Sequence, residues 1–479
     1  MLARLHRYLT IVALTAASFA SAQEPPAKAV QRWTNREGKT ISAAFVRMDG
    51  ANVVLRRGDG QELVYPLAKL SAASQAQARR LAAAAASKEN APPAPKQEPP
   101  PDPEQVLLAS IPAPATRDPA QPLVGAIRWD AWTGGWVTEA MQRTLGPAKY
   151  HERLPWFAEV KGDKQVRIDG NRQVIMDTEI AWAASAGLDY WAFLLYPESD
   201  VMSVSLAQYL KSPRRKDIGF CVVLHNALKV PDSQWPQELK RMIKLMKEPG
   251  YVTVLDGRPL VYEFEARSDD AGQKRFDEFR AAAKKEKLDP YCVFMGWNPA
   301  PDWAAQSPKG FDAVSHYARA SDLPSDFAGL VRENEEWMWQ SAAKEHVPYI
   351  PLVTTGWNKE PRKDNPVSWE VGHGYLKQTV FIPPATADEI AAHLRNALAF
   401  VKENPKTCPA NAIIMYAWNE HDEGGWLVPT WTAEGKPNTA RLDAIRRVLR
   451  QGVLPVTSAP PASGSPPGRV PGRRGARHP

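Results

Sequence analysis

The sequence predicts an α/β protein: a (β/α)₈ TIM barrel preceded by a small all-β, SH3-like domain and a linker rich in proline and alanine. Three observations carry this prediction. Residues 30–71 alternate apolar and polar side chains between glycine turns, and residues 83–121 are dense in alanine and proline. From residue 122 onward, short apolar runs alternate with amphipathic helical runs. The 479 residues are enough for a large core and more than one domain.

The first 22 residues have the features of an export signal. Arg4 and Arg7 precede an apolar run over residues 9–17, and the small residues Ala20–Ala22 follow. We therefore expect residues 1–22 to be removed and the protein to be periplasmic or extracellular. No other apolar run approaches the roughly 20 residues that a membrane span needs.

Residues 30–75 are expected to form the small β domain. Turns at "EGK", "DGAN" and "GDGQ" break the alternation, as in an antiparallel meander. The pattern W-T, G-K-T-I-x-A-x-F, D-G-x-V-x-L and P-L-x-x-L-S resembles the SLA homology domain one, an SH3-like fold. The resemblance implies a contact with a protein or peptide. A structural spacer is the alternative.

Residues 76–121 are expected to be a semi-rigid linker, because alanine- and proline-rich chain cannot build a core. Residues 453–479 are expected to be a disordered basic tail. The formal net charge is +7, but the first 22 residues carry two unopposed arginines and the tail four. About one net positive charge is left on the rest, so no nucleic-acid partner is expected.

Residues 122–452 are expected to form the barrel. Eight strand candidates occur, most of them followed by a helical run. They are residues 123–128, 189–195, 218–224, 259–264, 291–296, 312–317, 348–354 and 412–417. This count is typical of a (β/α)₈ barrel. A doubly wound open sheet is the alternative, although no glycine-rich phosphate loop follows the first strand.

In such a barrel the chemistry lies at the carboxyl ends of the strands. The side chains there are indoles, amides, imidazoles and carboxylates, which suit a sugar better than a phosphate, because flat rings stack on pyranoses and polar groups bind hydroxyls. The candidate sugar-binding residues are Trp129, Asp130, Tyr196, His225, Asn226, Glu263, Asn298, His316, Tyr317, Trp357, Asn419, His421 and Trp426.

The stretch "IIMYAWNEHDEGGWLVP" places Glu420 and Glu423 three residues apart at the exit of the last strand. Glycosidic cleavage commonly uses two carboxyl groups, one protonated and one ionised. Two acids in one dry site push their pKa values apart, which supplies both forms at one pH. The alternative is that these acids only cap a helix or face solvent. No spacing of Cys and His residues predicts a metal site.

The same stretch resembles the W/F-N-E-x-x-E-G motif of glycoside hydrolase family 99 and WbsX-like barrels, a group that includes endo-acting α-mannosidases. The pieces "AGLDYWAFLLYP", "LDGRPLVYEF", "GFDAVSHY" and "VTTGWNKEPR" are similar to the family and occur in its order. The resemblance implies a retaining glycosidase with a carbohydrate substrate and no metal or cofactor. Glu420 would be the base toward the substrate 2-hydroxyl, Glu423 the general acid/base, and Asn419, Tyr317 and Trp357 sugar contacts.

The motif departs from the family at His421 and Asp422, where the mannosidases usually have Trp-His. The sugar and the linkage therefore stay open. Two other functions compete with hydrolysis: a carbohydrate-binding barrel without catalysis, and a WbsX-like part in polysaccharide biosynthesis. Export argues against the second, because nucleotide-sugar donors are cytoplasmic.

Overall fold

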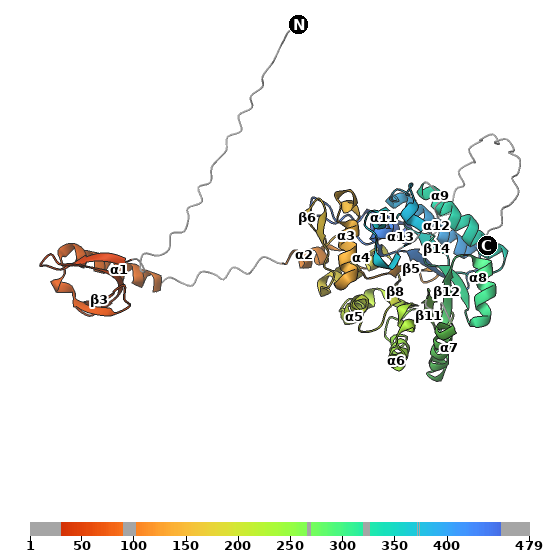
Figure 1. Cartoon of the computed structure of the whole chain (residues 1–479), viewed down its shortest axis with the longest axis horizontal. Helices are drawn as coiled ribbons and strands as arrows, with labels where there is room; N and C mark the ends of the chain where they lie inside the picture. Colours follow the sequence, from red (N-terminus) through yellow and green to blue (C-terminus); the bar gives the residue numbers. More distant parts are fainter. Residues whose placement is uncertain are drawn as a thin grey trace, which may run out of the picture. The chain divides into compact units, whose positions relative to one another are not determined.

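The computed structural model divides the chain into two compact units, residues 1–100 and 101–479, which we describe separately. The described residues are 30–89, 102–265, 270–319, 326–370, 372 and 374–451 (Figure 1). The expected signal and tail lie outside them.

The first unit is a four-stranded antiparallel meander in the order β1-β2-β3-β4, which confirms the small β domain. Its strands are β1 (Val30–Thr34), β2 (Thr40–Asp49), β3 (Asn52–Arg56) and β4 (Glu62–Pro66). Trp33 and Phe45 stack in its core, with ring centroids 6.4 Å apart. The resemblance to the SLA homology domain one stays a prediction.

Helix α1 (Ala72–Glu89) packs on this meander, inside the stretch expected to be linker. Ala78 is buried in the small core, and the Ser74 hydroxyl accepts a hydrogen bond from the Thr34 N–H at 3.0 Å. The alanine-rich stretch is therefore helical rather than extended, because alanine favours helix and its small side chain packs closely. The small domain runs past residue 75.

Helix α2 (Pro103–Ser110) corrects the other end of the expected linker. Asp102 caps it by accepting from the Glu104 N–H at 3.0 Å, and Pro103 occupies the first helical position. The helix packs on α4 (Gln173–Ala186), where Glu104 pairs with Arg172 at 2.5 Å. The barrel unit thus begins before residue 122.

The second unit is a closed barrel of eight parallel strands, as predicted. They are β5 (Leu123–Arg128), β8 (Tyr190–Leu195), β9 (Gly219–Leu224), β11 (Arg258–Glu263), β12 (Tyr291–Gly296), β13 (Ala313–His316), β14 (Leu352–Thr354) and β15 (Ala412–Tyr416). Hydrogen bonding orders them β13-β12-β11-β9-β8-β5-β15-β14. A parallel bridge between Val314 and Tyr349 joins the ends, and Ile350 N donates to Val314 O at 3.1 Å. This closure excludes the open sheet.

Helices surround the strands (Figure 1). Besides α4 they are α3 (Gly135–Leu145), α5 (Val204–Lys211), α6 (Trp235–Leu245), α7 (Asp270–Lys285), α8 (Pro299–Gln306), α9 (Phe327–Arg332), α10 (Gln340–Lys344), α11 (Glu360–Asp364), α12 (Ala387–Glu403) and α13 (Ala440–Gln451). A π-helix, Glu333–Trp339, joins α9 to α10. Strands β6 (Glu159–Gly162) and β7 (Gln165–Arg167) form a separate hairpin, and the short strand β10 (Thr253–Val254) pairs with β11.

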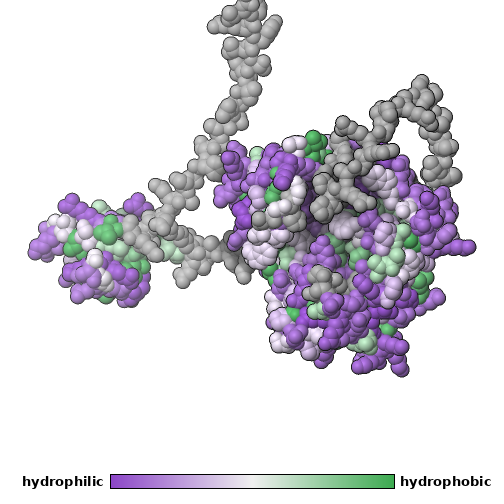
Figure 2. All heavy atoms as spheres, turned by 45° about the vertical axis from the view of Figure 1, so that its right-hand side comes forward, coloured by the Kyte–Doolittle hydropathy of each residue, from purple (hydrophilic) through white to green (hydrophobic). Residues whose placement is uncertain are grey.

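Hydrophilic residues predominate on the face of the barrel unit seen in Figure 2, with hydrophobic ones in small patches. Within the described residues, no helix is long and apolar enough to cross a membrane.

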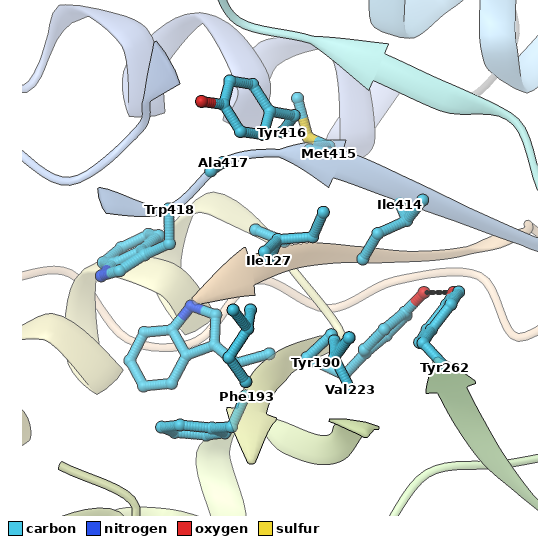
Figure 3. Close-up of a cluster of buried hydrophobic side chains, with 14 of the residues drawn as sticks. Ile127, Tyr190, Phe193, Val223, Tyr262, Ile414, Met415, Tyr416, Ala417 and Trp418 are labelled. Atoms are coloured by element: carbon cyan, nitrogen blue, oxygen red, sulfur yellow. Dashed lines mark hydrogen bonds between the residues drawn. The ribbon is translucent and has the colours of Figure 1, made fainter. Parts of the chain in front are cut away.

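Tyr190 fills the centre of the barrel (Figure 3). Its hydroxyl donates to the Ile413 carbonyl at 3.0 Å and contacts the Tyr262 hydroxyl at 2.9 Å, so Tyr262 is the donor in the second bond. Gly125 leaves room for the ring, since a Cβ there would lie 2.2 Å from it. Strands covered on both faces need such apolar packing along their whole length, which explains their continuous hydrophobic runs.

Replacing Tyr190 should therefore cost more than replacing Tyr262. Tyr190→Phe removes the bond to the Ile413 carbonyl, leaves the Tyr262 hydroxyl without the Tyr190 oxygen as acceptor, and should lower the free energy of unfolding by about 1–3 kcal/mol. Tyr262→Phe keeps the bond to Ile413 and should cost about 1 kcal/mol or less. Urea unfolding followed by tryptophan fluorescence measures both, and equal losses would contradict this account.

Candidate active site

A tight hairpin follows β15 and carries the acidic stretch. Its strands are β16 (Asn419–Glu420) and β17 (Gly425–Trp426), joined by a single turn at His421–Glu423. Gly424 has φ +88°, which glycine adopts without strain. A Cβ at Gly424 would lie 2.6 Å from the backbone nitrogen of Asn358, which donates to the Glu423 carbonyl. The glycine lets the loops after β14 and β15 touch.

The side chains of the turn point in different directions. Glu420 and Glu423 line one cavity of about 280 Å³ at the carboxyl end of the barrel. Asp422 is fully buried and faces Arg362. His421 stacks on Trp426 with ring centroids 5.7 Å apart, and its Nδ1–H donates to the Arg153 carbonyl. Only two of the three acids therefore face the cavity.

Glu423 is held as a carboxylate. Arg362 donates to its Oε1, Lys359 Nζ lies 2.9 Å from the same oxygen, and the Tyr416 hydroxyl donates to Oε2 at 2.5 Å. Burial alone would raise the pKa of this carboxyl, but the two cations outweigh burial and lower the pKa to about 2.

Glu420 is held as the neutral acid. Its carboxyl group accepts a hydrogen bond from Tyr317 and has no cation in direct contact among the described ion pairs. Burial first, and then the negative charge of Glu423, raise its pKa well above the usual value for a carboxyl. The two pKa values are therefore pushed in opposite directions, which favours a protonated Glu420 beside an ionised Glu423.

Arg362, on α11, organises the charges behind the cavity. Only 2% of its side chain is exposed. Its Nε and Nη2 bind both oxygens of Asp422 at 2.6 and 3.2 Å, and Nη1 binds Glu370 at 2.8 Å as well as Glu423. Lys359 adds a second bond to Glu370 at 2.7 Å. Such buried charges are stable only because each has a partner.

Five more of the predicted sugar-binding residues line the cavity: Trp129, Tyr196, His225, Asn226 and Tyr317. The Trp129 indole donates to the Tyr196 hydroxyl at 2.9 Å. Burial lowers the pKa of His225 to about 4, so its ring is neutral near pH 7 and donates to the Phe264 carbonyl.

The other predicted residues lie outside the cavity wall: Asp130, Glu263, Asn298, His316, Trp357, Asn419, His421 and Trp426. Several support the wall from behind. Asn419 accepts from the Trp129 backbone N–H at 2.9 Å, and Asp130 is paired with Arg128 at 2.9 Å. Trp426 lies under the guanidinium of Arg441, 3.7 Å from the ring centroid.

Four of the predicted residues outside the cavity have other surroundings: Glu263, His316, Asn298 and Trp357. Glu263 is buried at the end of β11, and Glu265 reaches the cavity two residues later. His316 bonds the Tyr349 hydroxyl at 2.9 Å, and burial lowers its pKa to about 3. Asn298 is exposed at the start of α8, and Trp357 packs on Tyr416.

Sequence reasoning missed several residues of the site: Trp136, Asp200, Lys359, Arg362, Trp369 and Glu370. A signal existed for two of them. Lys359 and Arg362 follow the strand 348–354 in "WNKEPR", and a cation pair at a strand exit near two acids indicates charge compensation. Within the described residues, no group of three or more His, Cys, Asp or Glu side chains is placed to hold a metal ion.

Comparison with known proteins assigns no family. No protein-family model and no curated protein matches the chain. Among solved structures, the glycoside hydrolase family 99 endo-α-mannosidase from Bacteroides thetaiotaomicron matches with 13% identity and a TM-score of 0.43, covering 70% of this chain and 98% of that one. A class V chitinase from Pseudomonas fluorescens matches with 13% identity and a TM-score of 0.27, covering 68% and 99%. Both neighbours are glycoside hydrolases, but likeness at this level establishes no activity.

Replacing Arg362 by an uncharged residue should lower the free energy of unfolding, because the buried acids lose this cation. Arg362→Met should lower the free energy of unfolding by about 3–5 kcal/mol at pH 7, because Asp422 loses its cation and Glu370 and Glu423 keep only Lys359. The loss should shrink as the pH falls toward 4. Without Arg362, the pKa of Glu423 rises from about 2, so the carboxyl takes up a proton instead of staying an uncompensated charge.

Urea unfolding at pH 7 and pH 4 measures both effects. The control is Lys149→Met, which removes exposed bonds to Glu360 and Asp364 from a side chain that is 53% exposed. That variant should cost about 1 kcal/mol or less. An Arg362→Met variant no less stable than this control would contradict the charge network.

Proposed function

We propose that this barrel hydrolyses glycosidic bonds of an oligosaccharide or polysaccharide. One observation carries the proposal: Glu420 and Glu423 open into the same aromatic-lined cavity, in surroundings that raise the pKa of the first and lower the pKa of the second. Cleavage of a glycosidic bond needs this combination, since the leaving oxygen must gain a proton while a carboxylate attacks or removes one. The resemblance of the "WNEHDEGG" stretch supports the same reaction.

In the proposed reaction, Glu420 gives its proton to the leaving oxygen as the glycosidic bond breaks. Glu423 removes a proton from the substrate 2-hydroxyl, whose oxygen attacks the anomeric carbon. Water then opens the epoxide-like ring that the 2-oxygen has formed with the anomeric carbon, and gives a proton to Glu420. Glu423 returns the proton that it removed to the 2-oxygen. Configuration is retained. This assignment reverses the roles implied by the family resemblance, because Lys359 and Arg362 stabilise the charge of Glu423 and not that of Glu420.

A carbohydrate-binding barrel without hydrolysis is the second candidate. It is favoured by the saturation of Glu423, whose two oxygens already accept from Arg362, Lys359 and Tyr416. In that case both acids would only bind sugar hydroxyls. Export and a protein or peptide contact of the small domain remain part of the proposal, on the strength of residues 1–22 and 30–75.

A glycan screen distinguishes hydrolysis from binding. Purified protein is incubated with α-mannans, α-glucans and sulfated polysaccharides, and new reducing ends and retention on the glycan are measured together. For a cleaved glycan, Glu420→Gln and Glu423→Gln should each lower kcat by about 10²–10⁴-fold, because each removes a proton-transfer group. Retention of a glycan without release of reducing ends would favour the binding barrel.

Substrates with different leaving groups separate the roles of the two acids. A dinitrophenyl group leaves without protonation, so the variant lacking the acid should recover most of its kcat/KM on a dinitrophenyl glycoside, because kcat/KM reports the step in which the leaving group departs. We expect Glu420→Gln to recover and Glu423→Gln to remain inactive. The opposite result would restore the roles that the resemblance implies and would overturn the charge-based assignment.

A further inference from the structure

Trp136 is a large aromatic side chain left open to solvent at the mouth of the cavity. It is 59% exposed and lines the same cavity as the two acids. Only two other tryptophans of the described residues are comparably exposed, Trp297 at 43% and Trp337 at 51%, and neither lines the cavity. An exposed indole beside a binding cavity indicates a ligand contact.

The backbone before Trp136 fixes its position. Gly134 and Gly135 have φ values of +108° and +68°, so the chain reverses just before α3. The Thr133 hydroxyl donates to the Val201 carbonyl at 2.7 Å, and a Cβ at Gly135 would touch the Val201 side chain at 3.5 Å. The turn is therefore tied to the loop after β8, which fixes the backbone from which the Trp136 side chain projects.

A row of flat groups leads from the acids to Trp136. The Arg362 guanidinium, bound to Glu423, lies 5.6 Å from the ring centroids of both Trp129 and Trp369. Trp369 in turn lies 5.2 Å from Trp136, with the two rings at 73°. Burial falls along this row, from fully buried Arg362 through half-buried Trp369 to exposed Trp136. A sugar chain entering at the cavity would meet Trp136 and Trp369 beyond the reacting ring.

The charges of the wall select against anionic sugars. Besides the two acids, Asp200, Glu265 and Glu370 line the cavity, and Arg362 is the only Arg or Lys side chain among its described lining residues. Arg362 is bound to carboxylates, as is Lys359 behind it. A sulfate or uronic carboxylate would find no unengaged cation there and would be repelled by the acids.

We infer that Trp136 and Trp369 form an outer subsite on which an uncharged sugar ring of the substrate stacks, one unit beyond the ring bound at Glu420 and Glu423. The inference rests on the proposed function and adds two properties to it. The substrate is at least a disaccharide, and its ring at this subsite carries no negative charge.

The test compares Trp136→Ala with Trp337→Ala, a matched exposed indole outside the cavity, and with the conservative Trp136→Phe. On a cleaved oligosaccharide, Trp136→Ala should raise KM about tenfold with kcat little changed, as expected for one lost stacking contact. The KM for a dinitrophenyl monosaccharide glycoside, which does not reach the subsite, should be unchanged. Trp136→Phe should restore most of the affinity, and Trp337→Ala should behave as wild type.

Calorimetric binding keeps this test separate from hydrolysis. Oligosaccharide is titrated into the Glu423→Gln protein with and without Trp136→Ala, together with a sulfated form of the same glycan. Weaker binding of the Ala variant and of the sulfated glycan supports the subsite, even if no glycan is cleaved and the proposed hydrolysis fails. The subsite is overturned by equal binding with and without Trp136, by no glycan binding, or by equal or tighter binding of the sulfated glycan.

Discussion

The buried guanidinium of Arg362 is the interaction on which the site depends. It pairs with Asp422, Glu370 and Glu423 at once, and its burial makes each of these bonds strong and each loss costly. Because it lies on the side of Glu423, the pair of cavity acids is electrically asymmetric. The difference in protonation between Glu420 and Glu423 follows from this placement rather than from any difference in their chemistry.

The barrel fold brings loops that are far apart in the sequence together at one end, where they form the site. The acids come from the loop after β15, the cations from the loop after β14, and the aromatic wall from the loops after β5, β8, β11, β13 and β14. Parallel strands all end on the same side, so residues that are hundreds of positions apart meet there. The closed sheet around Tyr190 fixes the distances between these loops.

The sequence predicted the strands well because buried parallel strands are continuous apolar runs. It also placed Glu420 and Glu423 side by side, because both lie on one short turn. It did not predict Arg362 or Trp136, since each lies several residues beyond a strand and reaches the cavity only through loop geometry. Conversely, Asp130 and His316 lie at the ends of strands but point into packed structure. Successive side chains of a strand point to opposite faces, and the residue types alone do not show which side chain at a strand end faces the cavity. The helices α1 and α2 were missed because proline density near residue 100 outweighed the helix propensity on either side.

The contact between the last two loops limits how the site can change. A Cβ at Gly356 would lie 2.2 Å from the Gly424 carbonyl oxygen, just as one at Gly424 would strike Asn358. The loop after β14, which bears the cations, and the loop after β15, which bears the acids, are therefore packed so closely that they form one structural unit. A designer who transplants this chemistry to another barrel must move both segments together, and drift of one during evolution is constrained by the other.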